Sequence, residues 1–422
     1  MNKLLLKRNY KYILFFIFLI LVSIIFSETR IISYNFWKYT TEIKLSDNNI
    51  DNSIDIWNDE MIHNIKLNLT KEDYKNLVLY YKSNEEKQYI KTDIEIDWVI
   101  INDIWLKLKW SNIIIWDLED VNTSEIDFSF TIKFDEYITD MTYLGRSEIA
   151  LISWTIDELK WEYIAWEIYE NFWIKSPDSS FVYLEWTDFI NKYYLVKEIV
   201  DEAFLAEEFN DSNGLLYKWE NSLSFTYLWE DPTAYTDLFT QKTLKNNYDL
   251  KKMISVLEFV SNSWNDNFKY QLSKYINIEN YTKFLAINNF LYWEKSKLKL
   301  LNSYYIYYDL STETIKFIPW DSQYPNNIED TSVYQVLEKI YSKQEIAELW
   351  KKDIREILWN ITGTIPDNLK SKYSNDLEDK FLKENNFEDL YNEVEEQIID
   401  ELESTNFIEN VDSRIENLFY NN

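Results

Sequence analysis

The chain has 422 residues, of which 46% are hydrophobic and 18% aromatic. This length allows one large domain or two medium ones, each with a sizeable buried core. Cysteine is absent and there is a single histidine, His63, so disulfides, thiolate metal sites and histidine-rich metal sites are excluded. The net charge of −30 is spread along the chain and argues against nucleic acid as a partner, because phosphate contacts need clustered lysine and arginine.

Residues 1–30 predict a membrane anchor. The basic residues Lys3, Lys7, Arg8 and Lys11 precede an apolar run over 13–26. Basic residues before an apolar segment keep the N-terminus in the cytoplasm and send the following chain outward. The run is slightly shorter than the roughly 20 residues of a spanning helix, so a cleaved signal peptide is the alternative to an uncleaved signal anchor. We expect a single-pass protein of the cell membrane whose bulk is extracytoplasmic.

Residues 31–60 are polar, rich in asparagine and aspartate, and predict a linker. Alternate positions in it carry side-chain oxygens, with a spacing similar to that of a calcium-binding loop: Asp47, Asn49, Asp51, Ser53 and Asp55. The glycine and the closing glutamate of such a loop are missing, since Asn52 and Asn58 stand in their places. An acidic linker is therefore the better interpretation.

Residues 61–200 read mainly as strands. Alternation of apolar and polar residues predicts half-buried strands at about 64–70, 93–97, 106–109 and 128–134, and a strand pair at 181–185 and 192–198. Helical spacing interrupts them at about 70–81 and 155–172. This part is predicted to form a strand-rich first lobe.

Residues 201–422 shift towards helix. Helices are predicted at about 201–209, 233–260, 267–275 and 279–292, and again after 331. One more hairpin is expected from 302–308 and 314–319. A strand-rich lobe over 61–200 followed by a helix-rich lobe over 201–422 predicts a two-lobed α+β protein.

The glycine content is anomalous. The chain has 3 glycines and 18 tryptophans, whereas glycine makes up about 7% of a typical globular protein. Trp98, Trp186 and Trp264 stand at predicted turns, where positive φ often demands glycine. The dense run from Trp105 to Trp173 is too large for one core. We hypothesise that many of these positions are glycine in the native protein, through reading of UGA as glycine; the alternative is an aromatic surface for a glycan or a partner.

A series of motifs follows in order between about 60 and 325. It starts at 104–112, with positions 105 and 110 read as glycine, and continues with Phe130-Thr-Ile-Lys-Phe-Asp-Glu-Tyr137, Ser179-Ser-Phe-Val-Tyr183, Tyr194-Leu-Val-Lys-Glu198, Val200-Asp-Glu-Ala-Phe-Leu205, Leu216-Tyr-Lys218, Asn302-Ser-Tyr-Tyr-Ile-Tyr-Tyr308 and Ile318-Pro-Trp-Asp321. In order and spacing the series resembles the spore-coat protein H (CotH) kinase family.

The resemblance implies an atypical protein-kinase-like fold and transfer of phosphate from ATP to serine or threonine of a protein, with Mg²⁺ or Mn²⁺. It also implies roles for the matching residues. Asp321 would hold the metal, with Asn302 as a second oxygen ligand. Lys109 or Lys218 would neutralise phosphate charge, and Glu198 would orient such a lysine.

The sequence departs from the family pattern in two places. The family carries an aspartate, the candidate catalytic base, shortly before the motif at 302–308, whereas the acidic residue here is Glu294. The family often has a second acid after the metal-binding aspartate, whereas Ser322 and Gln323 follow Asp321. Two functions therefore stay open, an extracytoplasmic CotH-like kinase of a surface protein and a catalytically degenerate surface binding or structural protein. A calcium-dependent glycan-binding protein is a third.

Overall fold

The structure, a computed structural model, describes residues 55–421 except 71, 74–75, 78–88, 112–127, 136–141, 187–189, 212, 220–224, 237, 245–248, 294–303 and 321–375. The predicted anchor at 1–30, most of the linker and the calcium-like loop up to residue 54 lie outside the described residues. Within the described part, no helix combines the length and apolar character needed to cross a membrane.

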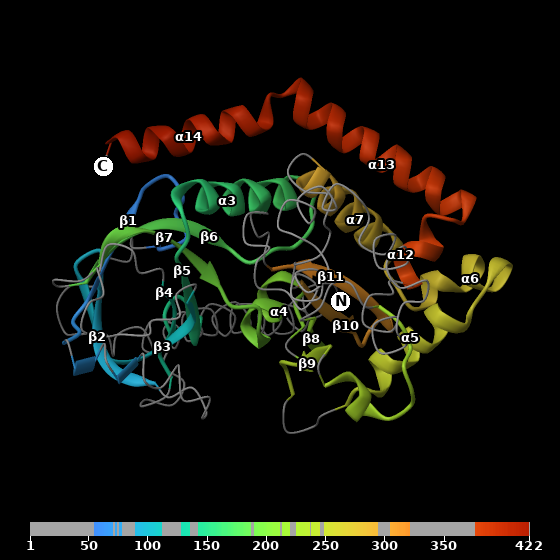
Figure 1. The fold of residues 1–422 in the computed structure, drawn as a ribbon, viewed down its shortest axis with the longest axis horizontal. Helices are drawn as coiled ribbons and strands as arrows, with labels where there is room; N and C mark the ends of the chain where they lie inside the picture. Colours follow the sequence, from blue (N-terminus) through green and yellow to red (C-terminus); the bar gives the residue numbers. More distant parts are fainter. Residues whose placement is uncertain are drawn as a thin grey trace, which may run out of the picture.

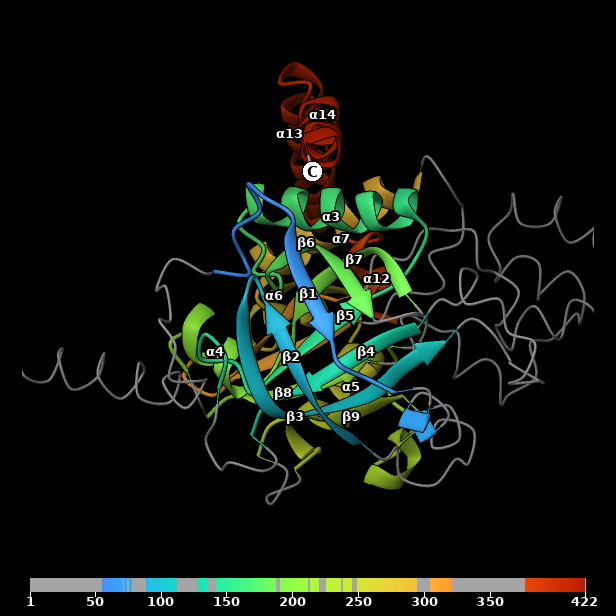
Figure 2. The same cartoon turned by 90° about the vertical axis from the view of Figure 1, so that its left-hand side faces the viewer.

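The first part of the chain forms a closed β-barrel (Figures 1 and 2). Its strands neighbour each other in the order β1-β2-β3-β4-β5-β7-β6: β1 (His63–Leu67), β2 (Ile90–Ile96), β3 (Val99–Ser111), β4 (Phe128–Lys133), β5 (Glu148–Ile152), β6 (Ser179–Trp186) and β7 (Ile190–Glu198). All pairs are antiparallel except β1 with β6, whose parallel ladder pairs Ile65 with Leu184. Alternate side chains fill the interior, as Tyr194 and Val196 of β7 do.

The β2–β3 hairpin turns on two residues, Asp97 and Trp98, which have φ of 44° and 73°. Positive φ at both central residues is the signature of a type I′ turn, where Asp-Gly is a favoured pair. The Trp98 side chain is 80% exposed and so gains little from packing. The backbone at position 98 therefore supports glycine there.

Helix α3 (Ile156–Asn171) covers the outer face of β6 and β7 (Figure 1). It begins with a capping box in which Thr155 and Glu158 satisfy each other's backbone N–H groups. After the helix ends, Trp173 has φ of 64°, and its N–H donates to the Glu170 carbonyl at 3.0 Å. The N–H of Ile174 donates to the Tyr169 carbonyl at 2.9 Å. These two bonds form a Schellman motif, whose left-handed residue is usually glycine.

The second part of the chain carries a four-stranded sheet in the order β11-β10-β8-β9. Its strands are β8 (Leu215–Trp219), β9 (Phe239–Gln241), β10 (Tyr304–Asp309) and β11 (Thr314–Pro319). The helices around it are α4 (Glu202–Glu208), α5 (Lys251–Asn262), α6 (Asn265–Gln271) and α7 (Ile278–Trp293). One apolar core joins this sheet to α3 and α7 through residues such as Tyr169, Phe284 and Phe317.

Three C-terminal helices, α12 (Asp376–Phe381), α13 (Asn385–Ser404) and α14 (Phe407–Asn421), form an outer layer on the helices that cover the two sheets (Figures 1 and 2). α13 packs on α7, and α14 packs on α3. Within α12, Lys380 donates to three carbonyl oxygens at the end of α5, those of Val260, Ser261 and Ser263. The sequence predicted a helical layer here, and the described residues 376–421 are helical.

The predicted α+β class is confirmed, while several elements differ in detail. The helix at 155–172, the strand pair 181–185 with 192–198 and the hairpin 302–308 with 314–319 are present as α3, β6–β7 and β10–β11. The helix predicted over 233–260 is wrong in its first half, because Phe239–Gln241 is strand β9 and the α-helix starts at Lys251. β5 and β8 were not predicted, since their buried runs do not alternate.

Four of the tryptophans bear on the glycine hypothesis, and they differ in backbone and burial. Trp98 and Trp173 are exposed and have positive φ, as the glycine hypothesis expects. Trp186 is fully buried, packs against the Phe130 ring at 6.1 Å and donates its indole N–H to Leu69 O at 3.3 Å. Trp264 has φ of −138°, which any residue adopts. The backbone thus favours glycine at 98 and 173 but not at 264, and Trp186 packs as a core residue.

Candidate functional site

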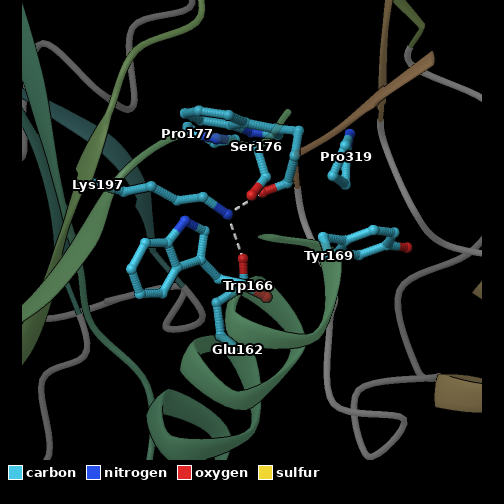
Figure 3. Close-up of a pocket in the computed structure, with 8 residues that line it drawn as sticks. Glu162, Trp166, Tyr169, Ser176, Pro177, Lys197 and Pro319 are labelled. Atoms are coloured by element: carbon cyan, nitrogen blue, oxygen red, sulfur yellow. Dashed lines mark hydrogen bonds and ion pairs between the residues drawn. The ribbon is translucent and has the colours of Figure 1, made fainter. Parts of the chain in front are cut away.

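A buried ion pair joins α3 to β7. Lys197 of β7 and Glu162 of α3 are 5% and 3% exposed, and the lysine ammonium donates to the Glu162 carboxylate and to the backbone carbonyl of Trp320 (Figure 3). Alternation along β7 sends Tyr194 and Val196 into the barrel and Lys197 to the opposite face, against α3. Buried charges are retained when they are paired and hydrogen-bonded. The contacts of Lys197 therefore link β7 to α3 and to the residue that follows β11.

A small, partly open pocket lies against this pair (Figure 3). Its lining comes from α3, the segment after it, β7 and the end of β11: Glu162, Trp166, Tyr169, Ser176, Pro177, Lys197, Pro319 and Trp320. The pocket is small and, in the described structure, holds little more than a water molecule beside the ammonium.

A second lysine converges on the same place from β3. The Lys109 ammonium lies 4.3 Å from the centroid of the Trp320 ring, and the Lys197 ammonium lies 5.0 Å from it. Ammonium groups within about 6 Å of an indole centroid are attracted by its electron-rich face. Two cations from distant strands thus surround the residue that immediately precedes Asp321 in the sequence.

The comparison with known families follows this geometry. The family model described as CotH kinase protein matches residues 123–418. The chain belongs to the CotH kinase family. The match covers α3, β7 and the β10–β11 hairpin, whereas Lys109 precedes its first residue. No curated protein matches the chain. The resemblance predicted from the motifs is therefore confirmed at the level of the family.

Glu198, predicted as the partner of a nucleotide-binding lysine, faces the other side of β7 from Lys197. Its carboxylate contacts Arg146, whose guanidinium also lies 2.7 Å from Glu207. Burial raises the pKa of the Glu198 carboxyl to about 8, and that of the nearby Asp178 carboxyl to about 6. The cation beside Glu198 is thus Arg146, whereas the sequence predicted a lysine. The neighbouring Lys197 points to the opposite face of β7, because side chains alternate along a strand.

The remaining predicted site residues are placed as follows. Lys218 lies in β8, opposite Tyr305 of β10 and Thr240 of β9, and is not part of the pocket lining. The three others, Glu294, Asn302 and Asp321, lie outside the described residues, and their roles as base and metal ligands stay predictions. Within the described residues, no group of three acidic or histidine side chains could hold a metal.

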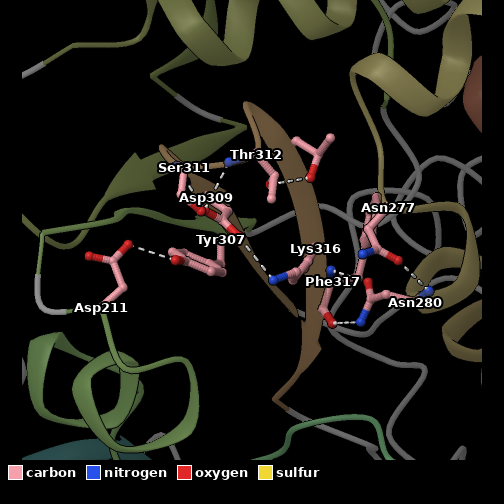
Figure 4. Close-up of polar contacts among 10 residues, drawn as sticks. Asp211, Asn277, Asn280, Tyr307, Asp309, Ser311, Thr312, Lys316 and Phe317 are labelled. Carbon is pink, nitrogen blue, oxygen red and sulfur yellow. Dashed lines mark hydrogen bonds and ion pairs between the residues drawn. The ribbon is translucent and has the colours of Figure 1, made fainter.

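Strand β11, which leads to Trp320, is held in place by hydrogen bonds from α7. Asn280 accepts from the Phe317 N–H at 2.6 Å and donates to the Phe317 carbonyl at 3.2 Å (Figure 4). The neighbouring residue Lys316 donates to Asp309 of β10 at 3.1 Å across the hairpin. These contacts hold the edge strand β11, and with it Pro319 and Trp320 of the pocket.

The central pair, Lys197 and Glu162, was missed in the sequence. Lys197 stands inside the motif Tyr194–Glu198, which drew attention only to its glutamate. Glu162 lies three residues after the buried Leu159 and seven before the buried Tyr169, so it belongs to the apolar stripe of α3. A charged residue on an apolar stripe and another in a buried strand were the available signals.

Proposed function

We propose that the chain is an extracytoplasmic CotH-like kinase that transfers phosphate from ATP to serine or threonine of a surface protein. The observation that carries the proposal is the buried Lys197–Glu162 pair beside the pocket. Phosphoryl transfer needs positioned positive charge more than covalent chemistry. A lysine fixed by a carboxylate in a sheltered site supplies such charge without reorganising during the reaction.

Each residue of the site has a defined task in this proposal. Glu162 orients the Lys197 ammonium, which binds phosphate oxygens. Lys109 adds a second positive charge across the Trp320 ring. Asp321 and Asn302 would hold Mg²⁺ or Mn²⁺, which neutralises charge developing between the phosphates.

The proposal includes a two-lobed arrangement like that of protein kinases. The barrel with α3 is the first lobe, at 61–200, and the second sheet with its helices is the second lobe, at 201–422. The pocket supports this division, because Glu162 and Lys197 come from the first part while Pro319 and Trp320 come from the second. Nucleotide would then bind where the two parts meet, on a protein held at the membrane by residues 1–30.

The test uses the full-length protein and ATP with Mg²⁺ or Mn²⁺. Phosphate transfer to a serine-rich acceptor protein is measured with radiolabelled ATP, and nucleotide binding with a fluorescent ATP analogue. Lys197→Met should lower transfer by about 100-fold or more, the usual effect of removing one charge-stabilising group. Lys192→Met, on the same strand but beside the Tyr194 ring, is the matched control and should retain activity. Full activity of Lys197→Met would remove the site from this place.

The second candidate is a catalytically degenerate member of the family that binds without turnover. Two observations favour it: the Lys197 ammonium already contacts both Glu162 and the Trp320 carbonyl, and the pocket is small. In that case wild-type protein binds nucleotide but transfers no phosphate. Asp321→Asn distinguishes a metal-dependent site, since an amide lacks the charge that a hard cation needs; it should abolish the metal dependence of binding.

A further inference from the structure

The C-terminal helices pack on two helices that carry or fix parts of the pocket. α14 lies along α3, and α13 lies along α7, which in turn fixes β11 through Asn280 (Figures 1 and 2). Residues 376–421 are thus far from 162 and 197 in sequence but adjacent to the helix and strand that carry them.

The contact between α14 and α3 is made by charges of opposite sign. Arg414 of α14 contacts the Glu167 carboxylate of α3, and its guanidinium lies 3.4 Å from the Tyr163 hydroxyl. Lys160 of α3 contacts Glu416 of α14 in the reverse sense. Because the two pairs run in opposite directions, they fix how α14 lies along α3.

An aromatic contact continues from α14 to the barrel. The Phe419 ring lies 4.5 Å from the Tyr193 ring of β7 and 5.1 Å from the Phe181 ring of β6, both edge to face. Edge-to-face pairs at this separation stabilise beyond the area they bury. One helix therefore holds α3, which carries Glu162, and β7, which carries Lys197.

We propose that Arg414 and Phe419 are positioning residues of the nucleotide site. Through their contacts with α3 and β7, α14 sets the separation of Glu162 and Lys197. The proposal rests on the proposed function, because the effect is read as nucleotide binding. Glu167 and Glu162 belong to the same helix, so a displacement of α3 at Glu167 moves Glu162 with it. Neither positioning residue lines the pocket.

The experiment is a double-mutant cycle on the full-length protein, read with a fluorescent ATP analogue and Mg²⁺. Arg414→Met and Glu167→Gln should each weaken nucleotide affinity by about fivefold, the low end of coupling between distinct sites. The double variant should be no weaker than either single variant, because both remove the same contact. Phe419→Ala removes the ring contact with β7 and should also weaken nucleotide affinity in the same assay.

The control is Lys91→Met, which removes an equally exposed cation from the Lys91–Asp103 pair of β2 and β3. It should lower stability as little as Arg414→Met does and leave nucleotide affinity unchanged. Thermal unfolding of every variant separates folding from binding. Wild-type affinity in folded Arg414→Met, or a double variant whose losses add, overturns this inference alone. Absence of nucleotide binding by wild-type protein overturns the proposed function together with it.

Discussion

Replacing Trp173 by glycine should stabilise the protein. The residue follows α3 with φ of 64°, a left-handed conformation that costs an L-residue about 1–2 kcal/mol. Its side chain is 82% exposed, so removing the ring sacrifices little burial. Glycine has greater conformational freedom in the unfolded chain, which lowers the free energy of unfolding by about 0.5–1 kcal/mol. The expected net gain is about 0.5–1 kcal/mol in the free energy of unfolding.

The assay is urea unfolding of wild-type and variant protein, with the melting temperature as a second measure. Because a given change in the free energy of unfolding shifts Tm less in a longer chain, a gain of this size raises Tm by about 1–3 °C. Trp264→Gly is the control, since Trp264 has φ of −138° and its ring receives the Lys380 ammonium at 4.2 Å. It should destabilise. A loss of stability in Trp173→Gly equal to that of the control refutes the backbone argument.

The same reasoning reaches the native protein. If UGA is read as glycine in the source organism, peptides of native protein should show glycine mass at 98 and 173, the two tryptophan positions with positive φ. Tryptophan masses at both positions would end the hypothesis.

Two further predictions concern the site and its surroundings. The raised pKa values of Glu198 and Asp178, about 8 and about 6 against ordinary values of 4.5 and 3.8, mean that the folded chain holds these protons more tightly than the unfolded chain. The free energy of unfolding should therefore fall as pH rises from about 4 to about 8. Glu198→Gln should flatten this slope in urea unfolding at pH 5 and pH 8, roughly the two ends of that range. An unchanged slope would contradict a raised pKa at Glu198. Asn280→Ala leaves the Phe317 N–H and carbonyl without the side chain that contacts both, and should lower the free energy of unfolding by about 1–3 kcal/mol. Asn280→Asp keeps the acceptor and should lose less in the same measurement.

Local patterns in the sequence predicted local structure. Alternation found β1 to β4 and the β6–β7 pair, and helical spacing found α3, because the strand and helix periods appear in consecutive residues. The buried run of β5, Glu148–Ile152, has no such period. The three residues of β9 are too short to show one.

The site depended on contacts that no local pattern contains. Lys197 meets Glu162 only because β7 and α3 pack together. Its second acceptor, the carbonyl of Trp320, lies 123 residues later in the sequence. The family motifs pointed to Glu198, one residue away, which faces Arg146 instead. In a strand, a shift of one residue exchanges the two faces, so Glu198 and Lys197, neighbours in the motif, meet different partners on opposite faces of β7.

The parallel ladder between β1 and β6 also has a consequence for how the chain is made. A chain synthesised from its N-terminus presents residues 63–67 long before residues 182–186 arrive to complete their pairing. Until then β1 can use only its β2 side, and its other edge offers open hydrogen-bonding groups. Closure of the barrel must therefore wait for a distant segment, a step that chain topology makes slow. During synthesis, that exposed strand edge is where a chaperone or a neighbouring nascent chain would bind first.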